Sequence, residues 1–389
     1  MSDWVTVSLN EIAFINPTEK LAKGTLATKI GMDNLQPFSK KVSAQIQENY
    51  NGGMKFRNGD TIVARITPCL ENGKTAYIDT LKDGEIGFGS TEYIVLRAKV
   101  GLSNSHFLYY FARSDTFRDV AIASMTGSSG RQRVQTEVVV NHTFELPTLP
   151  EQKAIASVLS SLDDKIDLLH RQNKTLEAMA ETLFRQWFIE EAKEDWEDKP
   201  LSSIATFTNG LACQKYPPQP NEPKLPVLKI KDLTSGISDS SDWATANVDP
   251  KYIVNHGDVI FAWSASLMVK IWSGETCVLN QHLFNVTSDE YPKWFFYQWC
   301  KYHLEEFISI SQSHATTMGH IKRKDLDEAM VKVPSQPELQ EMTTSFEPLM
   351  DKLITNLKQI QTLEKLRDTL LPKLMSGEVR VQFKEESAA

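Results

Sequence analysis

Residues 146–187 read LPTLPEQKAIASVLSSLDDKIDLLHRQNKTLEAMAETLFRQW, and this segment gives the clearest indication of the architecture. Between Ile155 and Trp187, residues at alternating steps of four and three are apolar, with Asn173 as the exception. Such a heptad seam is typical of helices that pair along one face. Pro150 suits a first helical turn, where its missing N–H has no intrahelical partner to lose. The segment therefore predicts a long helix over about residues 150–190.

A second seam with the same spacing runs from Met342 to Leu374, interrupted by Asn356 and Arg367, and predicts a helix over about residues 337–371. Two seams of matching phase favour an antiparallel coiled coil. The alternative is that each helix packs on its own globular domain. The predicted seam residues are Leu162, Ile166, Leu169, Asn173, Leu176, Leu349, Leu353, Asn356, Ile360 and Leu363.

An antiparallel pair centred on these seams places Asn173 opposite Asn356. A buried amide without a partner costs on the order of 1–3 kcal/mol, whereas two facing amides can bond each other. Such a polar pair fixes the register of the helices. The alternative is that each asparagine lies near the edge of the seam and bonds water.

The chain is also a repeat of itself. Trp4 and Leu9 recur as Trp196 and Leu201, 192 positions later. Residues 58–63 (NGDTIV) match residues 256–261 (HGDVIF), both a Gly-Asp turn leading into a β-branched strand. The loop at residues 130–133 has its counterpart at residues 319–323. Two domains of the same α+β fold are expected, related by a pseudo-twofold internal repeat.

The predicted division is a first globular domain (1–149), a first long helix (150–192), a second globular domain (193–333), a second long helix (334–378) and a C-terminal tail (379–389). Within the globular domains, residues 104–120 and 292–308 are predicted to form helices with an aromatic face.

Composition narrows the class of protein. The chain has 389 residues with a formal net charge of −8, which disfavours DNA binding by the chain alone because phosphate contacts need Lys and Arg. A basic face, or a partner with more basic surface, would resolve that conflict. Four widely separated cysteines are typical of reduced thiols, and there is no secretion signal or apolar span, so a cytoplasmic protein is expected.

No catalytic motif is complete. Gly73-Lys74-Thr75 ends like a phosphate-binding loop, but Pro68 stands where the earlier glycine belongs. Gly87-Phe88-Gly89 is an isolated fragment of a dinucleotide motif, and the only Pro-Pro pair lacks the frame of an amino-methyltransferase tetrad. The histidines do not cluster at metal-ligand spacing. The sequence predicts a chain without an active site or metal of its own.

The double repeat, the LPTLPEQ phrase (146–152) before the first helix and the LLPKLMSGEVRV phrase (370–381) after the second resemble the specificity subunits of type I restriction-modification enzymes. The resemblance covers essentially the whole chain; residues 336–340 (QPELQ) depart from it by one leucine. It implies two target-recognition domains that each read half of a split double-stranded DNA site, held apart by antiparallel helices.

The resemblance also implies partners. The helices would dock two modification (methyltransferase) subunits, to which restriction subunits add. S-adenosylmethionine would bind the modification subunits, and ATP and Mg²⁺ the restriction subunits, so this chain would bind no cofactor. Two alternatives stay open: a scaffold with two binding modules and no DNA role, and an enzyme with an unfamiliar site.

Base edges are read by Arg, Lys, Asn, Gln and small hydroxyl side chains. Two loops have that composition, and the residues predicted to face DNA there are Ser128, Ser129, Arg131, Gln132 and Arg133, with His314, Thr316, Thr317, His320, Lys322 and Arg323 in the counterpart loop. Further candidates are Arg65, Thr67 and Lys74 in the first domain, and Trp263, Ser264, Lys270, Gln281 and His282 in the second. Trp263 is alternatively a core residue.

Overall fold

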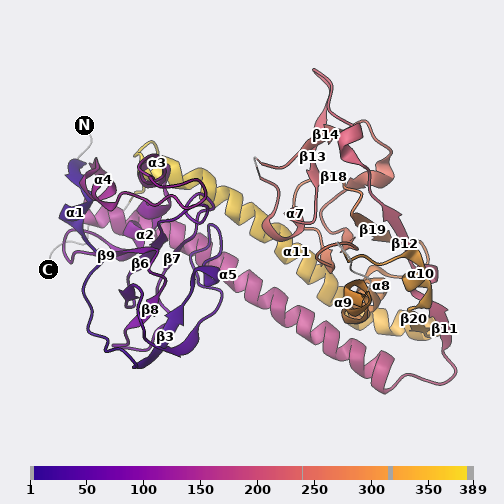
Figure 1. Ribbon diagram of the computed structural model, residues 1–389. Coiled ribbons are helices and arrows are strands. Elements are labelled where there is room, and N and C mark those ends of the chain that lie inside the picture. Colours follow the sequence, from indigo (N-terminus) through magenta and orange to yellow (C-terminus); the bar gives the residue numbers. More distant parts are fainter. Residues whose placement is uncertain (1–3, 239, 314–318, 383–389) are drawn as a thin grey trace. The chain divides into compact units, whose positions relative to one another are not determined.

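A computed structural model describes residues 4–238, 240–313 and 319–382 (Figure 1). The chain divides into two compact units. The first contains the described residues up to Asp167 and those from Leu363 onward, and the second is Leu168–Thr362. Each unit therefore combines one globular part with portions of both long helices. The predicted domain boundaries, which lie at the ends of the long helices, stay a prediction.

The first unit holds a two-stranded ribbon and two four-stranded sheets, with strand orders β1-β10, β2-β9-β6-β7 and β4-β3-β8-β5. Its strands are β1 (Val5–Ser8), β2 (Ala13–Ile15), β3 (Leu26–Ile30), β4 (Ile46–Asn49), β5 (Lys55–Phe56), β6 (Thr61–Ala64), β7 (Thr75–Tyr77), β8 (Gly87–Gly89), β9 (Tyr93–Ala98) and β10 (Thr143–Leu146). Its helices are α1 (Leu9–Ile12), η1 (Met32–Asn34), α2 (Ser105–Arg113), α3 (Asp115–Ala123), α4 (Thr136–Asn141) and the start of α5 (Leu149–Arg185).

The second unit has the orders β11-β20, β12-β19-β16-β17 and β14-β13-β18-β15. Its strands are β11 (Glu197–Pro200), β12 (Thr206–Asn209), β13 (Lys224–Leu228), β14 (Trp243–Thr245), β15 (Ile253–Val254), β16 (Val259–Ala262), β17 (Met268–Ile271), β18 (Cys277–Leu279), β19 (Leu283–Thr287) and β20 (Met330–Val333). Its helices are α6 (Leu201–Ile204), η3 (Cys213–Lys215), α7 (Asp232–Ser235), η4 (Pro250–Tyr252), α8 (Lys293–Tyr302), α9 (Leu304–Ser313), α10 (Arg323–Glu328) and most of α11 (Gln336–Met375).

The two globular parts share one fold, as the repeat predicted, because each sheet of the first has a partner with the same strand order in the second. The Gly-Asp turns before β6 and β16 agree in detail. Gly59 and Gly257 both have φ of +90°, a left-handed conformation that glycine adopts without strain. Asp60 accepts a hydrogen bond from the Arg57 backbone N–H at 2.9 Å, and Asp258 accepts one from the Asn255 N–H at 2.8 Å. The same short phrase thus starts the same strand twice.

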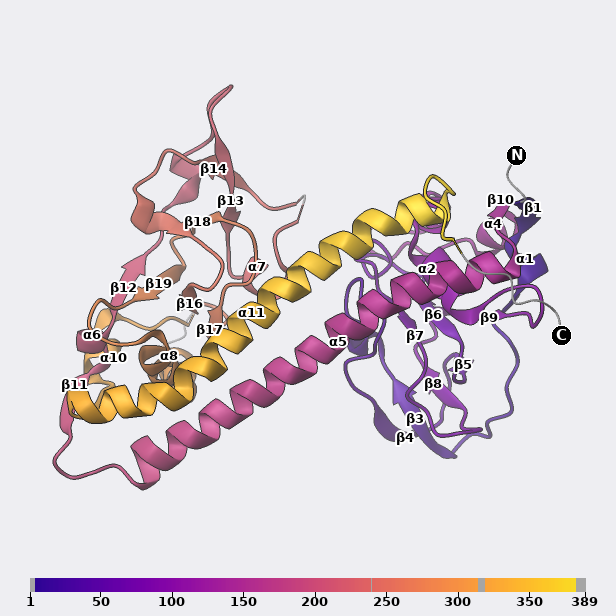
Figure 2. The ribbon, with the colours of Figure 1, turned by 180° about the vertical axis from the view of Figure 1, so that it is seen from behind.

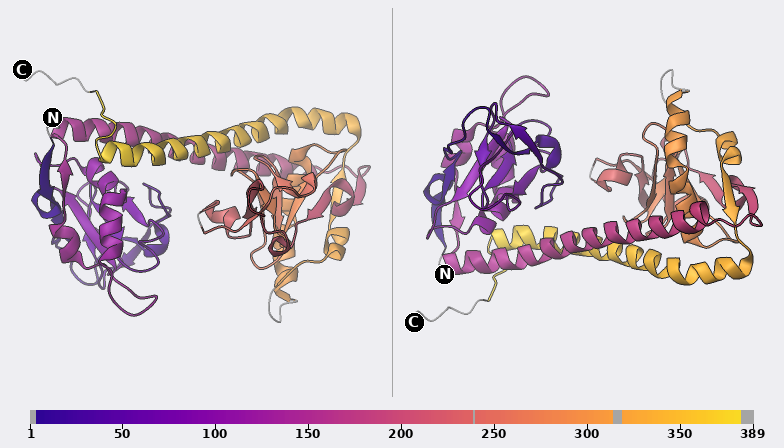
Figure 3. Two further views of the ribbon diagram at one scale, coloured as in Figure 1. Left: turned by 90° about the horizontal axis from the view of Figure 1, so that it is seen from above. Right: turned by 90° about the horizontal axis from the view of Figure 1, so that it is seen from below.

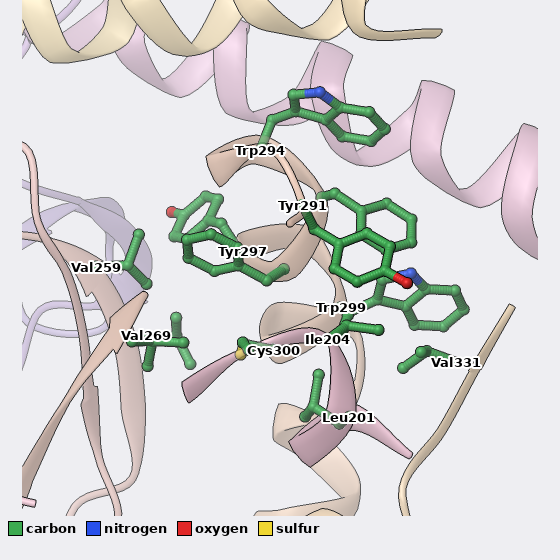
Figure 4. Packing of buried hydrophobic residues seen from close by; sticks show 14 of the residues in the cluster. Leu201, Ile204, Val259, Val269, Tyr291, Trp294, Tyr297, Trp299, Cys300 and Val331 are labelled. Atoms are coloured by element: carbon green, nitrogen blue, oxygen red, sulfur yellow. The ribbon is translucent and has the colours of Figure 1, made fainter. Parts of the chain in front are cut away.

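The aromatic segments are helical, as predicted, although each is broken once. α2 ends at Arg113 and α3 begins at Asp115, while α8 ends at Tyr302 and α9 begins at Leu304. Figure 4 shows α8 side chains such as Trp294, Tyr297 and Trp299 within the core of the second unit. The ring of Trp294 stacks on Phe346 of α11 at 4.2 Å between centroids, so this core extends onto the long helix.

The cysteines are free. Cys213, Cys277 and Cys300 are buried, and Cys69 is half-buried. Burial raises the pKa of the Cys213 thiol to about 11. The buried thiols therefore stay protonated and pack as small apolar groups.

The long helices have close to the predicted extent: α5 covers Leu149–Arg185 and continues as a π-helical segment, η2 (Gln186–Glu190), while α11 covers Gln336–Met375. In each unit the two helices lie side by side and run in opposite directions (Figures 2 and 3). In the second unit Asn173 contacts Asn356, and Trp187 contacts Phe346. Residue numbers therefore decrease along α11 in the direction in which they increase along α5, so the two helices are antiparallel.

Both interpretations of the seam hold, in different parts of the helices. Near its start α5 packs on the core of the first globular part through Ile155 and Leu159. Leu353 of α11 belongs to the core of the second. By contrast, Leu169 and Ile360 are almost fully buried outside both of these cores, on the faces where the two helices meet. The helices therefore pair with each other and with a domain.

The predicted asparagine pair is present. Asn356 Nδ2 donates to Asn173 Oδ1 at 2.9 Å, and both residues are buried, with Asn356 fully so. Asn173 Nδ2 and Asn356 Oδ1 have no hydrogen-bond partner among the described residues. One bond, rather than a reciprocal pair of bonds, therefore links the two amides. The alternative of two water-bonded asparagines at the seam edge is wrong.

Replacing either asparagine alone with leucine is expected to lower the free energy of unfolding by about 1–3 kcal/mol, because the remaining buried amide loses its partner. Replacing both is expected to keep or raise stability but to loosen the register. Denaturant unfolding measures the first effect. Spin labels on exposed positions of the two helices measure the second as a broader distance distribution. A double variant less stable than both single variants would contradict this account.

Candidate nucleic-acid interface

Three chain segments meet beside the end of β6 in the first domain. The Arg65 backbone N–H donates to the Glu92 carbonyl at 3.0 Å, and the Val134 N–H donates to the Arg65 carbonyl at 2.9 Å. Thr126 and Arg133 exchange backbone hydrogen bonds of 3.0 and 2.8 Å, which close the intervening loop. The backbone thus places Arg65, Glu92 and Arg133 together, although they are far apart in sequence.

The side chains of these residues form an Arg–Glu–Arg cluster. Arg133 donates to Glu92 through Nε at 2.9 Å and through Nη2 at 2.8 Å, and Arg65 Nε donates to the same carboxylate at 3.1 Å. The hydrogen bond from Arg133, and then that from Arg65, hold the pKa of Glu92 below its ordinary value, although partial burial acts the other way. Arg133 remains 44% exposed and Arg65 32% exposed, so both guanidinium groups reach the surface.

The second domain has the same backbone frame with other side chains. The Trp263 N–H donates to the His282 carbonyl at 3.4 Å, the Ile321 N–H to the Trp263 carbonyl at 3.1 Å, and Ser264 forms an isolated bridge with His320. The ring centroid of Trp263 lies 6.1 Å from that of His282 and 6.3 Å from that of His320. We call these three residues the Trp–His–His cluster.

Backbone pairing makes the two clusters position-by-position equivalents. Arg65 corresponds to Trp263, Glu92 to His282 and Arg133 to His320, because each trio makes the same bridge and the same strand-end hydrogen bonds. Trp263 is also half-buried and stacks on Phe284 at 5.6 Å, so the alternative of a core residue holds for part of its ring. One backbone frame therefore presents an ionic cluster in one domain and an aromatic, imidazole-rich cluster in the other.

This register corrects the predicted match between the two loops. The sequence comparison aligned the first residues of 130–133 and 319–323, whereas the structure pairs Gln132 with Gly319 and Arg133 with His320. Lys322 and Arg323 then fall at the start of α10, which matches the start of α4. The two basic residues are exposed there, outside the cluster. The error arose because glycine marks both loops but at different positions.

Other predicted residues surround the clusters. Arg131, Ser128 and Ser129 are exposed on the loop beside Arg133, and Gln132 is half-buried. In the second domain Ser264 Oγ lies 3.2 Å from His282 Nδ1, and Gln281 Nε2 lies 3.3 Å from His282 Nε2. Gln281 and His282 also line a cleft of about 430 Å³. His314, Thr316 and Thr317 lie outside the described residues.

Three predicted residues make internal contacts instead. Lys74 Nζ donates to the Met32 carbonyl at 2.9 Å, and Lys270 Nζ donates to the Leu233 carbonyl at 3.1 Å. The Thr67 hydroxyl faces the Met125 sulfur at 3.8 Å. Each of these side chains has a structural role that its residue type did not reveal.

Glu92 is a member of the candidate interface that the sequence did not predict. His282 was a candidate and Glu92 is its equivalent, but this equivalence follows from the strand pairing in the structure. An acidic residue was not sought, since attraction to phosphate favours cations.

The first unit also contains a buried ionic network where α2 meets both long helices. Asp163 of α5 accepts hydrogen bonds from Arg367 Nη1 of α11 at 2.8 Å and from the Tyr110 hydroxyl of α2 at 2.6 Å. Arg113 Nη1 lies 3.8 Å from Asp163, and Arg113 Nη2 lies 3.7 Å from Asp368. The side chains of Asp163, Arg113 and Arg367 are each no more than 5% exposed.

The second unit replaces the Asp163–Arg367 pair of this network with apolar residues. Glu151 and Glu338 begin the two helices in equivalent places, 187 positions apart, and the same offset relates Asp163 to Met350 and Arg367 to Ala180. Met350 and Ala180 both belong to the apolar core of the second unit. The two ends of the helix pair are therefore chemically distinct.

The chain is therefore a duplicated sheet domain in which each copy is followed by a long helix, and the two copies carry different polar side chains on one backbone frame. The family model of the type I restriction modification DNA specificity domain matches residues 1–178 and again residues 193–365. The chain therefore belongs to this family of DNA specificity subunits of type I restriction-modification systems.

Individual relatives agree. The chain is 28% identical over 305 residues to the specificity subunit of the type I restriction enzyme MjaIX of Methanocaldococcus jannaschii, covering 72% of this chain and 70% of that protein. It is 31% identical over 211 residues to the EcoAI specificity subunit of Escherichia coli, covering 50% and 35% respectively. The crystal structure of a type I S subunit from M. genitalium has the same fold, with 17% identity, 96% of each chain covered and a TM-score of 0.54.

Two further findings concern the described part of the chain. No helix there is long and apolar enough to cross a membrane. No group of three or more His, Cys, Asp or Glu side chains in that part has a geometry that would hold a metal ion. As a specificity subunit, the chain is non-catalytic in itself.

Proposed function

We propose that each globular domain reads one half of a bipartite DNA site through the loops around its cluster. One observation carries the proposal: equivalent backbone positions hold Arg65, Glu92 and Arg133 in one domain and Trp263, His282 and His320 in the other. A common frame with different surface chemistry is what two different half-sites require, since base edges differ in their donors and acceptors. The paired helices would set the distance between the half-sites.

The charge of the chain supports a role for partner subunits in DNA binding. With a net charge of −8, it carries more negative than positive charge, so subunits with basic surface would supply most of the affinity for DNA phosphates. We infer that the long helices dock two modification (methyltransferase) subunits, and that restriction subunits add to those. S-adenosylmethionine would bind the modification subunits, and ATP and Mg²⁺ the restriction subunits.

Methylome sequencing of a host that carries this chain with its modification subunits tests the proposal. The expected result is one methylated motif made of two defined halves separated by an unspecified spacer of fixed length. Binding of the purified complex to that motif should weaken steeply with salt, because phosphate contacts release counterions. A host without any new methylated motif, together with a complex that does not bind DNA, would overturn the proposal in favour of an interaction scaffold.

Arg131→Ala and Arg133→Ala are each expected to weaken DNA binding by the assembled complex by roughly 1–3 kcal/mol if they contact bases. The two variants differ in their side effects. Arg131 is exposed and makes no side-chain hydrogen bond to another described residue, so its removal should leave the stability of the chain unchanged. Arg133 pairs with Glu92, so its removal also frees that carboxylate. Titration of labelled DNA into the complex measures both, and unchanged binding removes that arginine from the interface.

A further inference from the structure

Within the proposed interface, Glu92 occupies an unusual place for an acidic residue. It lies between two arginines at the surface of a domain that is expected to meet a polyanion, and its own side chain is only 21% exposed. A carboxylate there opposes phosphate binding. Its contacts suggest a different role, because it fixes the orientation of both guanidinium groups.

The hydrogen bonds show which edge of each guanidinium is in use. Glu92 takes the Nε–Nη2 edge of Arg133, whose Nη1 approaches the Arg131 carbonyl at 3.4 Å. It takes only the Nε of Arg65, whose two terminal nitrogens make no hydrogen bond to another described residue. A guanidinium has five N–H donors in a fixed plane. A carboxylate bound to one edge therefore fixes that plane, and the remaining N–H groups of the terminal nitrogens are held in position for another pair of acceptors.

Guanine presents such an acceptor pair, N7 and O6, in the major groove, and a bidentate arginine is its commonest specific contact. A phosphate is also bound by arginine, but a phosphate contact gains nothing from a neighbouring carboxylate, whose charge repels it. The Arg–Glu–Arg arrangement therefore favours base reading over backbone binding.

The equivalent cluster in the second domain has no fixed guanidinium. Trp263 Nε1 donates to Asn209 Oδ1 at 3.2 Å, and the Ser264 hydroxyl lies beside His282. This cluster offers hydroxyl, amide and imidazole groups next to an aromatic face. The side-chain chemistry differs at all three equivalent positions, and at the Glu92/His282 position an imidazole stands in place of the carboxylate that holds the two arginines.

We propose that Glu92 is a positioning residue that presents Arg65 and Arg133 to guanine in one half of the target, and that the Glu92/His282 position makes the two domains differ in specificity. This inference rests on the proposed function, because it assumes that each domain reads a half-site. It adds the base that the first domain reads and the residue that makes reading possible.

The test uses the complete complex with its modification subunits and compares Glu92→Gln with Glu48→Gln. Glu48 is a matched control, since it is a surface carboxylate of the same domain, 45% exposed and paired with Lys29 at 2.9 Å, outside the clusters. Both changes remove one negative charge and keep the side-chain shape. Binding is measured on the methylated motif and on variants with each G·C pair of one half replaced.

A good bidentate contact discriminates between bases by roughly 5- to 150-fold. Glu92→Gln is expected to reduce discrimination at one G·C pair of one half-site by about tenfold and to leave the other half unchanged. Non-specific binding should not weaken, because the change removes a charge that opposes phosphate binding. Arg133→Lys should cause the same loss, because lysine keeps the charge but not the planar pair of donors. Glu48→Gln should bind as the wild-type complex does.

Several results would overturn the inference while leaving the proposed function intact. One is a wild-type motif with no G·C pair in the half that changes when the first domain is replaced. Another is discrimination by Glu92→Gln within twofold of the wild type. A third is an equal loss at both half-sites, which indicates a general structural role. If Glu92→Gln prevents assembly of the complex, Arg133→Lys decides by the same criterion. Absence of any bipartite motif in the wild type refutes the proposed function itself.

Discussion

Asp163→Ala is expected to lower the free energy of unfolding of the first unit by about 3–5 kcal/mol, because removing one partner of a buried ion pair leaves the other charge uncompensated. Arg367 and Arg113 would both lose this carboxylate, and the Tyr110 hydroxyl would lose its acceptor. Asp368, which is 55% exposed, would remain as an ion-pair partner of both guanidinium groups. Few single substitutions in the chain should cost as much.

The second unit supplies the compensating variant. Its equivalents of Asp163 and Arg367 are Met350 and Ala180, so Asp163→Met combined with Arg367→Ala copies an arrangement that this chain already packs. Replacing a buried ion pair with apolar residues is often neutral or stabilising. Because Arg113 stays buried without this carboxylate, the double variant should regain only the part of the stability that the unpaired charge of Arg367 costs. Asp351→Ala, an exposed change on α11, should stay within about 0.5 kcal/mol of the wild type.

Thermal unfolding of the full chain, with hydrogen exchange read at residues 149–167, measures these effects on the first unit. Faster exchange confined to that segment locates the damage where Asp163 lies. A loss below about 1 kcal/mol for Asp163→Ala would mean that solvent reaches the network. A double variant no better than the single one would show that packing, rather than unpaired charge, dominates.

Replacement of residues 1–149 by the corresponding domain of a relative is expected to exchange one half of the methylated motif completely. Each mismatched base pair costs about 1–3 kcal/mol of binding free energy, and the costs are roughly additive. The original half-site differs at several base pairs from the one that the new domain reads, so its methylation should become undetectable. The other half and the spacer length should stay unchanged, because the second domain and the helices are unaltered. Methylome sequencing before and after the exchange measures the outcome.

The incoming domain must supply two contacts to α5. Glu151 at the start of α5 accepts a hydrogen bond from Trp4 Nε1 at 2.9 Å, and Asp163 accepts one from Tyr110. A donor domain with tryptophan and tyrosine at these positions keeps the contacts to α5. An exchange that alters both halves of the motif, or neither, contradicts modular recognition. Loss of all methylation by a domain without these two residues would instead indicate failed docking.

The sequence predicted features whose causes are local. The two long helices follow from spacing within one segment, and the Asn173–Asn356 contact follows from the centre of two such seams. The shared fold follows from repeated phrases such as the Gly-Asp turn, which specifies a backbone conformation by itself.

The candidate interface was harder to predict because its residues come from distant segments of the chain. Arg65 and Trp263 are 198 positions apart, Glu92 and His282 are 190, and Arg133 and His320 are 187, so no single offset aligns the clusters. Only strand pairing fixes these equivalences, and insertions in loops hide it from the sequence. The internal contacts of Lys74 and Lys270 were likewise invisible, since residue type does not tell which way a cation points.

The polar layers between the helices also decide which helix each can accept. If the α5 helices of two copies paired with each other in the same register, Asn173 would meet Leu169, and Asp163 would meet Ala180. Each buried amide or charge would then lack a partner, with a cost on the order of 1–3 kcal/mol or more for each. The chain's own α11 meets both requirements, with Asn356 and Arg367. Pairing of α5 with α11 of the same chain is therefore favoured over pairing of α5 helices from two chains. The two halves stay together in one molecule, and each can diverge in sequence from the other.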